Sequence, residues 1–292
     1  MPQGVAAQVQ PKRSVGARPT ATAMRDATIP AMSSTRLWDR AAQLPATTDG
    51  RPRPELAGLP TGLPSLETLF TFARDAELRF ETLRMRIEER TWTARGEHLT
   101  VLDTAVRHPG DARVTTAEPG LGTSAGYEVW ISDGEVVRTY SATHRLGTRR
   151  PVREAVRGID GNPDVPGMSR VYWPLTSLPM ETLPDVFIHP AGLCQNVLAT
   201  GRCWVSGTDE IIGREAIVAT CDHPRSVELA ADRPDHRLRV SFDRETGLIL
   251  RLVESIDAGV TRDAIVVDLA PDATLAPVTF DFSFPADTTL LY

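Results

Sequence analysis

Hydrophobic and polar residues alternate along most of the chain beyond residue 80. In the clearest stretch, 80–88, every second residue from Leu83 to Ile87 is apolar and the residues between them are charged. A period of two with one charged face predicts a strand that has one side in water. Similar patterns predict further strands at 98–107, 112–117, 127–131, 136–140, 202–207, 211–221, 236–243, 248–256, 260–269 and 278–283.

Helical spacing is confined to short segments. Apolar residues between 65 and 76 recur on one helix face, and Ser65 can cap the first turn, so a helix is predicted there. A second short helix is predicted at 181–188. Few helices among many short strands predict a mainly β fold of the α+β class, built on an up-and-down antiparallel sheet.

Turn and loop signals separate these elements. The most distinct turn is Ser132-Asp133-Gly134-Glu135, because an Asp-Gly pair accepts the positive φ angles of a tight hairpin. The stretch 141–180 is irregular and rich in Gly, Pro and Arg. A long excursion of this kind inside a compact domain is typical of a functional or mobile segment.

The first sixty residues differ from the rest in composition. They are rich in Pro, Ala, Thr, Arg and Gln, and their apolar residues are sparse and aperiodic. Such a segment buries too little apolar surface to offset its ordering entropy, so 1–60 is predicted to be a disordered tail. Leu37, Ala41 and Leu44 share a helical face, and a short docking helix at 37–44 is possible. The folded domain is then 61–292.

Composition excludes several classes of protein. The chain has 292 residues, of which 41% are hydrophobic, and a net charge of −6, which disfavours nucleic-acid binding. No stretch approaches the ~20 apolar residues of a membrane helix. No signal peptide follows Lys12 and Arg13, so the chain as written is expected in the cytoplasm. Export would require a different start site, and neither Met24 nor Met32 opens a convincing signal peptide.

Candidate chemical motifs are present but lack the context that their chemistry needs. Gly122–Gly126 matches a G-x-S-x-G nucleophile pattern, yet the required strand before it and helix after it are missing. The dyads Asp222-His223 and Asp235-His236 join adjacent residues, which point to opposite faces of a strand. No catalytic residue is assigned, and the absence of a glycine-rich phosphate loop leaves no cofactor predicted.

Three cysteines, Cys194, Cys203 and Cys221, are too few and too unevenly spaced for a disulfide framework. With His189 and His223 nearby they offer zinc-type ligands, but their spacing matches no known zinc motif. The favoured interpretation is three free thiols and no metal. A disulfide between Cys194 and Cys203 is the alternative in an oxidising compartment.

Several ordered segments together resemble the LolA-like superfamily of lipoprotein carriers, which includes sigma-factor regulatory sensors and mycobacterial lipid-carrying lipoproteins. The chain is similar to a divergent member of actinobacterial type. The resemblance begins with an early helix that leads to the strand 80–88, a Pro-centred turn within 105–114, and an Asp-Gly hairpin at 132–134 followed by Tyr140. It continues with a Gly-Arg strand start at 212–216, a closing hairpin at 242–252 and a last strand at 280–285 that ends in Phe and Pro.

The resemblance implies an unclosed barrel, which is an incurved antiparallel sheet covered by a few helices, with an apolar cavity between them. It implies binding of an apolar or acylated ligand, either a lipid or a lipidated protein, without catalysis. Since relatives are exported and this chain shows no export signal, an intracellular binding role fits better. Two alternatives are a regulatory protein-interaction module, like the sigma-factor sensors, and an enzyme with an unrecognised site.

A curved sheet with one apolar face must cover that face or bind something on it. Four aromatic residues are the candidates for lining such a cavity: Trp130, Tyr140, Trp173 and Trp204. The alternative is that they are ordinary core aromatics, since large rings usually serve packing.

Overall fold

The computed structural model describes residues 56, 58–119, 126–152, 174–180, 182–224 and 235–291. The chain separates by its internal contacts into 1–30 and 31–292, and every described residue belongs to the second unit. The predicted tail before residue 56, with its helix at 37–44, therefore lies outside the described residues. So do the small-residue loop at 122–125 and positions 153–173 of the excursion.

The described part of the chain is built on one sheet of twelve strands in the order β12-β6-β5-β4-β3-β2-β1-β11-β10-β9-β8-β7. The strands are β1 (Thr82–Thr93), β2 (Gly96–Arg107), β3 (Asp111–Ala117), β4 (Tyr127–Asp133), β5 (Val136–Ser141), β6 (Leu146–Pro151), β7 (Arg202–Ile211), β8 (Arg214–Asp222), β9 (His236–Asp243), β10 (Ile249–Ile256), β11 (Gly259–Pro271) and β12 (Thr289–Leu291).

Two antiparallel meanders, β1–β6 and β7–β11, make up the sheet and join where β1 pairs with β11. The end strands β7 and β12 are not paired with each other, so the sheet stays open. The prediction of a mainly β fold with an unclosed sheet is confirmed. The prediction of a purely antiparallel sheet needs one correction, because β12 runs parallel to β6.

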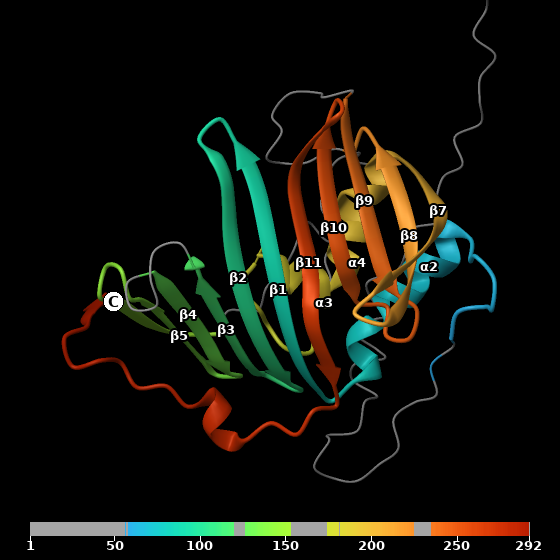
Figure 1. Cartoon of the computed structure of the whole chain (residues 1–292). Coiled ribbons are helices and arrows are strands. Elements are labelled where there is room, and N and C mark those ends of the chain that lie inside the picture. Colours follow the sequence, from blue (N-terminus) through green and yellow to red (C-terminus); the bar gives the residue numbers. More distant parts are fainter. Residues whose placement is uncertain are drawn as a thin grey trace, which may run out of the picture. The chain divides into compact units, whose positions relative to one another are not determined.

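Helices lie on one side of this sheet, which we call the inner face (Figure 1). They are α2 (Leu66–Arg74), α3 (Leu183–Ile188) and α4 (Pro190–Asn196), with the 3-10 turns η2 (Ala76–Arg79) and η4 (Leu198–Thr200). Helix α2 starts where predicted, since the Ser65 hydroxyl accepts a hydrogen bond from the Thr68 amide at 3.1 Å. Helix α2 packs on β7, and α3 packs on β10.

Alternate residues of β1 lie on opposite faces of the sheet, as predicted. Leu83, Met85 and Ile87 point to the inner face and are fully buried. Arg86 points to the opposite side, which we call the outer face, where its guanidinium donates to Asp103 on β2 at 2.7 and 2.9 Å. Exposed pairs of this kind contribute only about 0–1 kcal/mol each, so burial on the inner face dominates stability.

The predicted strand at 278–283 is wrong. The chain instead forms the 3-10 turn η5 (Pro277–Phe280) and then an extended segment, with Phe282 and Phe284 packed on the outer face. We call 277–291 the C-terminal strap (red in Figure 1). The rings of Tyr140 and Phe282 lie 6.0 Å apart, and packing against this aromatic group replaces strand pairing in the segment.

The expectation of irregular structure throughout 141–180 is also wrong at its start. Strand β6 pairs with β5 there, and the hydroxyls of Thr139 and Thr148 hydrogen-bond across the pair at 2.6 Å. Gly147 lies beneath the strap, because an added Cβ would come within 2.6 Å of the Phe284 ring. Strand β6 therefore provides the surface that receives the end of the chain.

Candidate functional site

The inner face changes from apolar to polar along the length of its strands. In β1 the buried Leu83, Met85 and Ile87 are followed in the same phase by Glu89 and Thr91. The same change occurs in β10, where Leu250 and Leu252 precede Glu254, and in β11, where Val266 and Ala264 lie beside Arg262. We call the apolar part the floor and the polar part the rim.

Arg262 forms the centre of the rim. Its Nε donates to Glu89 on β1 at 2.5 Å, and its Nη1 donates to Glu254 on β10 at 3.3 Å. All three side chains are mostly buried. Burial opposes the charge of Arg262, but the two carboxylates outweigh it and raise the pKa of the guanidinium. The rim therefore holds a compensated charge cluster directly beyond the floor.

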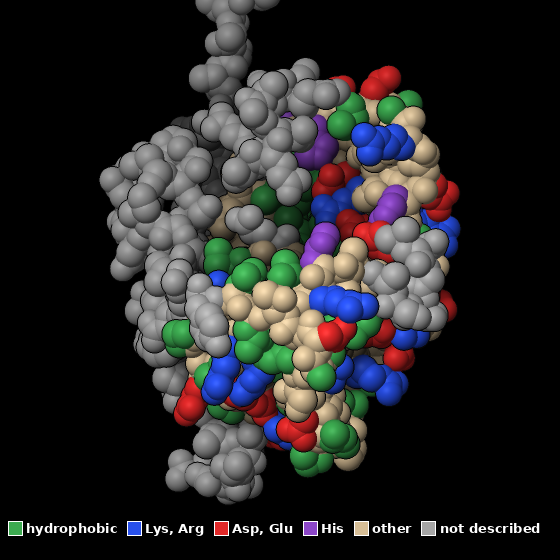
Figure 2. Space-filling view, turned by 90° about the vertical axis from the view of Figure 1, so that its left-hand side faces the viewer, with side chains coloured by type: hydrophobic (Ala, Val, Ile, Leu, Met, Phe, Trp, Pro, Cys, Tyr) green, Lys and Arg blue, Asp and Glu red, His purple; other side chains and the backbone are tan. Residues whose placement is uncertain are grey.

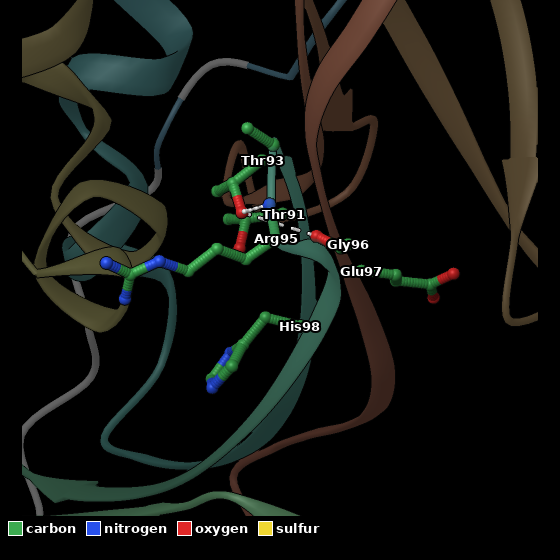
Figure 3. Close-up of a pocket in the computed structure, with 7 residues that line it drawn as sticks. Thr91, Thr93, Arg95, Gly96, Glu97 and His98 are labelled. Carbon is green, nitrogen blue, oxygen red and sulfur yellow. Dashed lines mark hydrogen bonds between the residues drawn. The ribbon is translucent and has the colours of Figure 1, made fainter.

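The rim continues on β2 and β3 into a second, more exposed polar group. His98 Nε2 lies 3.4 Å from Glu118 Oε2. The tip of the β1–β2 hairpin next to them borders a pocket of about 480 Å³, lined by Thr91, Thr93, Ala94, Arg95, Gly96, Glu97 and His98. Arg95 and His98 extend to the same side of the hairpin, and Glu97 extends to the other side (Figure 3).

The side of the molecule near β4 and β5 is hollowed. Figure 2 shows hydrophobic side chains inside this hollow, with acidic, basic and histidine side chains along one border. The arrangement can accommodate a molecule with an apolar body and a polar end.

The predicted aromatic residues do not gather in one cavity. Residues that pair across neighbouring strands lie on the same face of a sheet. Trp130 pairs with Val114, Val114 pairs with Thr104, and Thr104 pairs with the inner-face residue Met85. The half-buried Trp130 therefore lies on the inner face. Tyr140 pairs instead with Val129 and lies on the outer face in the cluster that the C-terminal strap covers. Among the four, Trp130 is the described residue that shares a face with the floor.

The remaining two aromatic candidates are far from Trp130 or beyond the described chain. Trp204 is 40% exposed on the outer face of the edge strand β7, where it pairs with Thr220. Trp173 lies outside the described residues. A ligand-binding role for each of the four stays a prediction, and the geometry places Trp130 best for it.

The Asp222-His223 motif takes a structural position in the described chain. Asp222 does not pair with His223; its carboxylate accepts from Arg202 and Arg237, both at 2.7 Å, which holds its pKa below the ordinary value. Within the described ranges no three His, Cys, Asp or Glu side chains lie close enough to hold a metal ion. None of the helices in these ranges is long and apolar enough to cross a membrane.

Sequence reasoning missed the rim, although a signal was present. Every second residue of 83–89 points inward, and this series passes from Leu83, Met85 and Ile87 to Glu89. In 250–254 the corresponding series ends at Glu254. A carboxylate at an inward position demands a partner, since burying an unpaired charge is costly. The partner, Arg262, comes from a strand far away in sequence, so its identity required the register.

A buried polar network was also missed. His189 on the α3–α4 junction lies between Asp185, at 3.0 Å, and Glu77, at 3.5 Å, and all three side chains are almost fully buried. Glu77 also accepts the Leu175 amide at 2.8 Å. Burial raises the pKa of Glu77, although the nearby His189 opposes the shift. Such closed surroundings favour a structural role over contact with a substrate.

No family model and no curated protein matches the chain. Solved structures resemble it at low identity. An uncharacterised conserved protein from Thermus thermophilus is 11% identical, with a TM-score of 0.43 over 77% of this chain and 97% of that protein. MucB of Pseudomonas aeruginosa, solved with MucA, is 13% identical, with a TM-score of 0.43 over 77% of this chain and 63% of that protein.

A LolA superfamily protein from Nitrosomonas europaea is 8% identical, with a TM-score of 0.32 over 75% of this chain and 98% of that protein. The chain spans less than two thirds of MucB.

Proposed function

We propose that the chain is a non-enzymatic binding protein for an apolar or acylated ligand, held between the inner face of the sheet and its helices. The observation that carries this proposal is the change from floor to rim along β1, β10 and β11. An apolar chain would lie beside the half-buried Trp130, next to the already buried floor, and its polar end would meet the rim around Arg262. The ligand is a lipid or a lipidated protein segment.

The energetics of such binding follow from apolar burial. Each methylene removed from water contributes about 0.8 kcal/mol before the cost of association. The half-buried Trp130 offers an aromatic surface at the side of the floor. The compensated cluster of Arg262, Glu89 and Glu254 offers both donors and acceptors to a polar end without leaving a charge unpaired.

A pair of tryptophan variants tests the site. Native mass spectrometry and solvent extraction of purified protein should reveal a bound acyl compound, and stripped protein should take up a fluorescent fatty acid. Trp130→Ala on the inner face should weaken uptake about fivefold or more, which corresponds to about 1 kcal/mol. Trp204→Ala on the outer face is the matched control and should bind like the wild type.

Two results would overturn the proposal. One is stripped, folded protein that takes up no acyl probe. The other is equal uptake by Trp130→Ala and wild type at every probe concentration, since a ligand on the inner face must sense that ring. Circular dichroism of each variant separates loss of binding from loss of fold.

A second candidate function is regulatory binding of another protein. The observation that favours it is the edge strand β7, where Trp204 and Arg202 are exposed on one face and no strand follows in the sheet. An edge strand can add an extended segment of a partner through main-chain hydrogen bonds. For this function the variants exchange roles: Trp204→Ala should lose a partner that Trp130→Ala retains.

A further inference from the structure

The three cysteines of the chain meet at one end of the β7–β8 pair. Cys203 on β7 lies directly opposite Cys221 on β8 in the antiparallel register. Both side chains point to the inner face, where Cys194 of α4 is also buried and near enough to interact electrostatically with Cys203. All three are free thiols. The pairing differs from the alternative of a Cys194–Cys203 disulfide that the sequence left open.

Directly opposite residues in an antiparallel pair have Cα atoms about 4.5–5.5 Å apart. Disulfides bridge Cα atoms about 4.4–6.8 Å apart, so the strand backbone already holds Cys203 and Cys221 within bonding range. Cys194 sits on a different element and has no such register with either strand. The fold therefore selects one pair out of three cysteines.

The sulfur of Cys221 has surroundings that support a thiolate. It accepts hydrogen bonds from the Cys203 thiol and from the Gly201 amide, and together these hold the pKa of Cys221 below its ordinary value despite burial. The pKa of Cys203 is raised by the same hydrogen bond and by burial, and burial alone raises the pKa of Cys194. The first proton thus leaves the Cys203–Cys221 pair more easily than it leaves Cys194.

Access to the pair is through β7. Cys203 is half-buried on the edge strand of the sheet, whereas Cys194 and Cys221 are buried. A small oxidant that reaches the inner side of β7 meets Cys203 first. Within the pair the negative charge is favoured on Cys221, which lies directly opposite Cys203.

We propose that Cys203 and Cys221 form an oxidisable dithiol that a peroxide converts into a cross-strand disulfide, while Cys194 stays a thiol. A thiolate of the pair attacks one peroxide oxygen; the S–O bond forms, the O–O bond breaks, and the leaving hydroxide becomes water with the proton that this thiol gave up on ionising. The second thiol then attacks the sulfenic sulfur; the S–S bond forms, the S–O bond breaks, and the leaving hydroxide takes the proton of the second thiol to form a second water. Two electrons pass from the sulfurs to the peroxide.

Oxidation would act on the connection between η4 and β7. In the reduced chain the Cys221 thiol donates to the Leu198 carbonyl at 3.4 Å, and a disulfide has no proton for this bond. Gly201 leaves little room there, because an added Cβ would lie 2.6 Å from the Cys221 sulfur. The disulfide therefore exchanges a hydrogen bond to the helix side for a covalent link within the sheet.

Peptide mapping of the full chain after treatment with hydrogen peroxide tests the proposal. Intact mass should fall by two hydrogens, one thiol should remain, and the linked peptides should contain Cys203 and Cys221. In urea, where the chain is unfolded, the main disulfide should become Cys194–Cys203. Along the chain Cys203 is twice as far from Cys221 as it is from Cys194. Loop closure then favours the nearer pair about threefold.

Variants provide the matched controls. Cys194→Ala should lose the same two hydrogens as the wild type, whereas Cys203→Ala should lose none. A native-state link that contains Cys194, or a Cys194→Ala protein that keeps both remaining thiols under peroxide, would overturn the proposal. The wild-type map is decisive by itself if a variant fails to fold.

Discussion

At the scale of single residues, the buried network of Glu77, His189 and Asp185 is the most unusual chemical feature of the helix side. Its members join η2 to the α3–α4 junction in surroundings closed to solvent. A raised carboxyl pKa means that the folded chain holds this proton more tightly than the unfolded chain does. The contribution of Glu77 to stability is therefore complete below its ordinary pKa and is lost as the pH rises through its folded value.

Glu77→Gln should remove this pH dependence. The amide oxygen can still accept the Leu175 amide, but the side chain can no longer ionise. Urea unfolding at about pH 5 and about pH 8 should show the variant gaining stability relative to wild type at the higher pH. Glu67→Gln, at an exposed position of α2, is the control. Its free energy of unfolding should change between the two pH values by as much as that of the wild type. Parallel pH profiles for wild type and Glu77→Gln would contradict the assignment.

The rim provides a second residue-scale prediction. Arg262→Ala leaves Glu89 and Glu254 facing each other without a cation. We expect a loss of about 2 kcal/mol in the free energy of unfolding near neutral pH, because two mostly buried carboxylates lose their cation.

Arg86→Ala removes an exposed arginine of the outer face and serves as the control, with an expected loss of about 0–1 kcal/mol. Chemical denaturation of both variants near neutral pH measures the two losses. Equal losses for Arg86→Ala and Arg262→Ala would show that the rim is no more than a solvated surface.

At the scale of elements, local pattern predicted the strands whose two faces differ. Strand β1 was found from its alternation, and α2 from its apolar face and Ser65 cap. Strand β6 was missed because Gly147 and Thr148 have no apolar pattern; one lies beneath a ring and the other bonds across the pair. The pattern of Phe280, Phe282 and Phe284 is that of a strand, yet Phe280 ends a 3-10 turn, and Phe282 and Phe284 pack on the sheet without joining it.

The C-terminal strap yields a prediction at this scale. Gly147→Ala places a methyl group within 2.6 Å of the Phe284 ring, so the strap must shift. Gly259→Ala is the control, since its Cβ would meet only the Ile256 carbonyl at an ordinary 3.6 Å. Hydrogen exchange in 279–291 should become faster in Gly147→Ala and stay unchanged in Gly259→Ala. Unchanged exchange in both variants would show that the ring does not hold the strap.

At the scale of the whole described unit, one long-range pairing unites the sheet. Every neighbouring pair within the two meanders is consecutive in sequence, whereas β1 and β11 lie far apart along the chain. Hydrophobic alternation identifies faces but does not identify which distant strand becomes the neighbour. The sequence therefore could not predict the pairing of β1 with β11. It could not predict the rim either, because Glu89 and Arg262 meet across that pairing.

The position of a strand in the sheet predicts how well its backbone amides are protected from hydrogen exchange. Amides in β1 and β11 are flanked by strands on both sides, and β7 and β12 have a neighbour on one side only. Native-state hydrogen exchange should be slowest in β1 and β11 and fastest in β7 and β12. Protection of β7 equal to that of β1 would indicate that another chain covers this edge in solution.

The placement of β11 and the strap near the end of the chain has a consequence for biosynthesis. While the ribosome is still translating the second meander, the first one has neither its central neighbour nor the aromatic cover over Val129 and Ile131. The nascent protein therefore exposes this apolar surface until the strap has been synthesised. A stop codon placed just before residue 277 should produce an aggregation-prone product that chaperones retain, so abundance in the cell is expected to depend sharply on the strap.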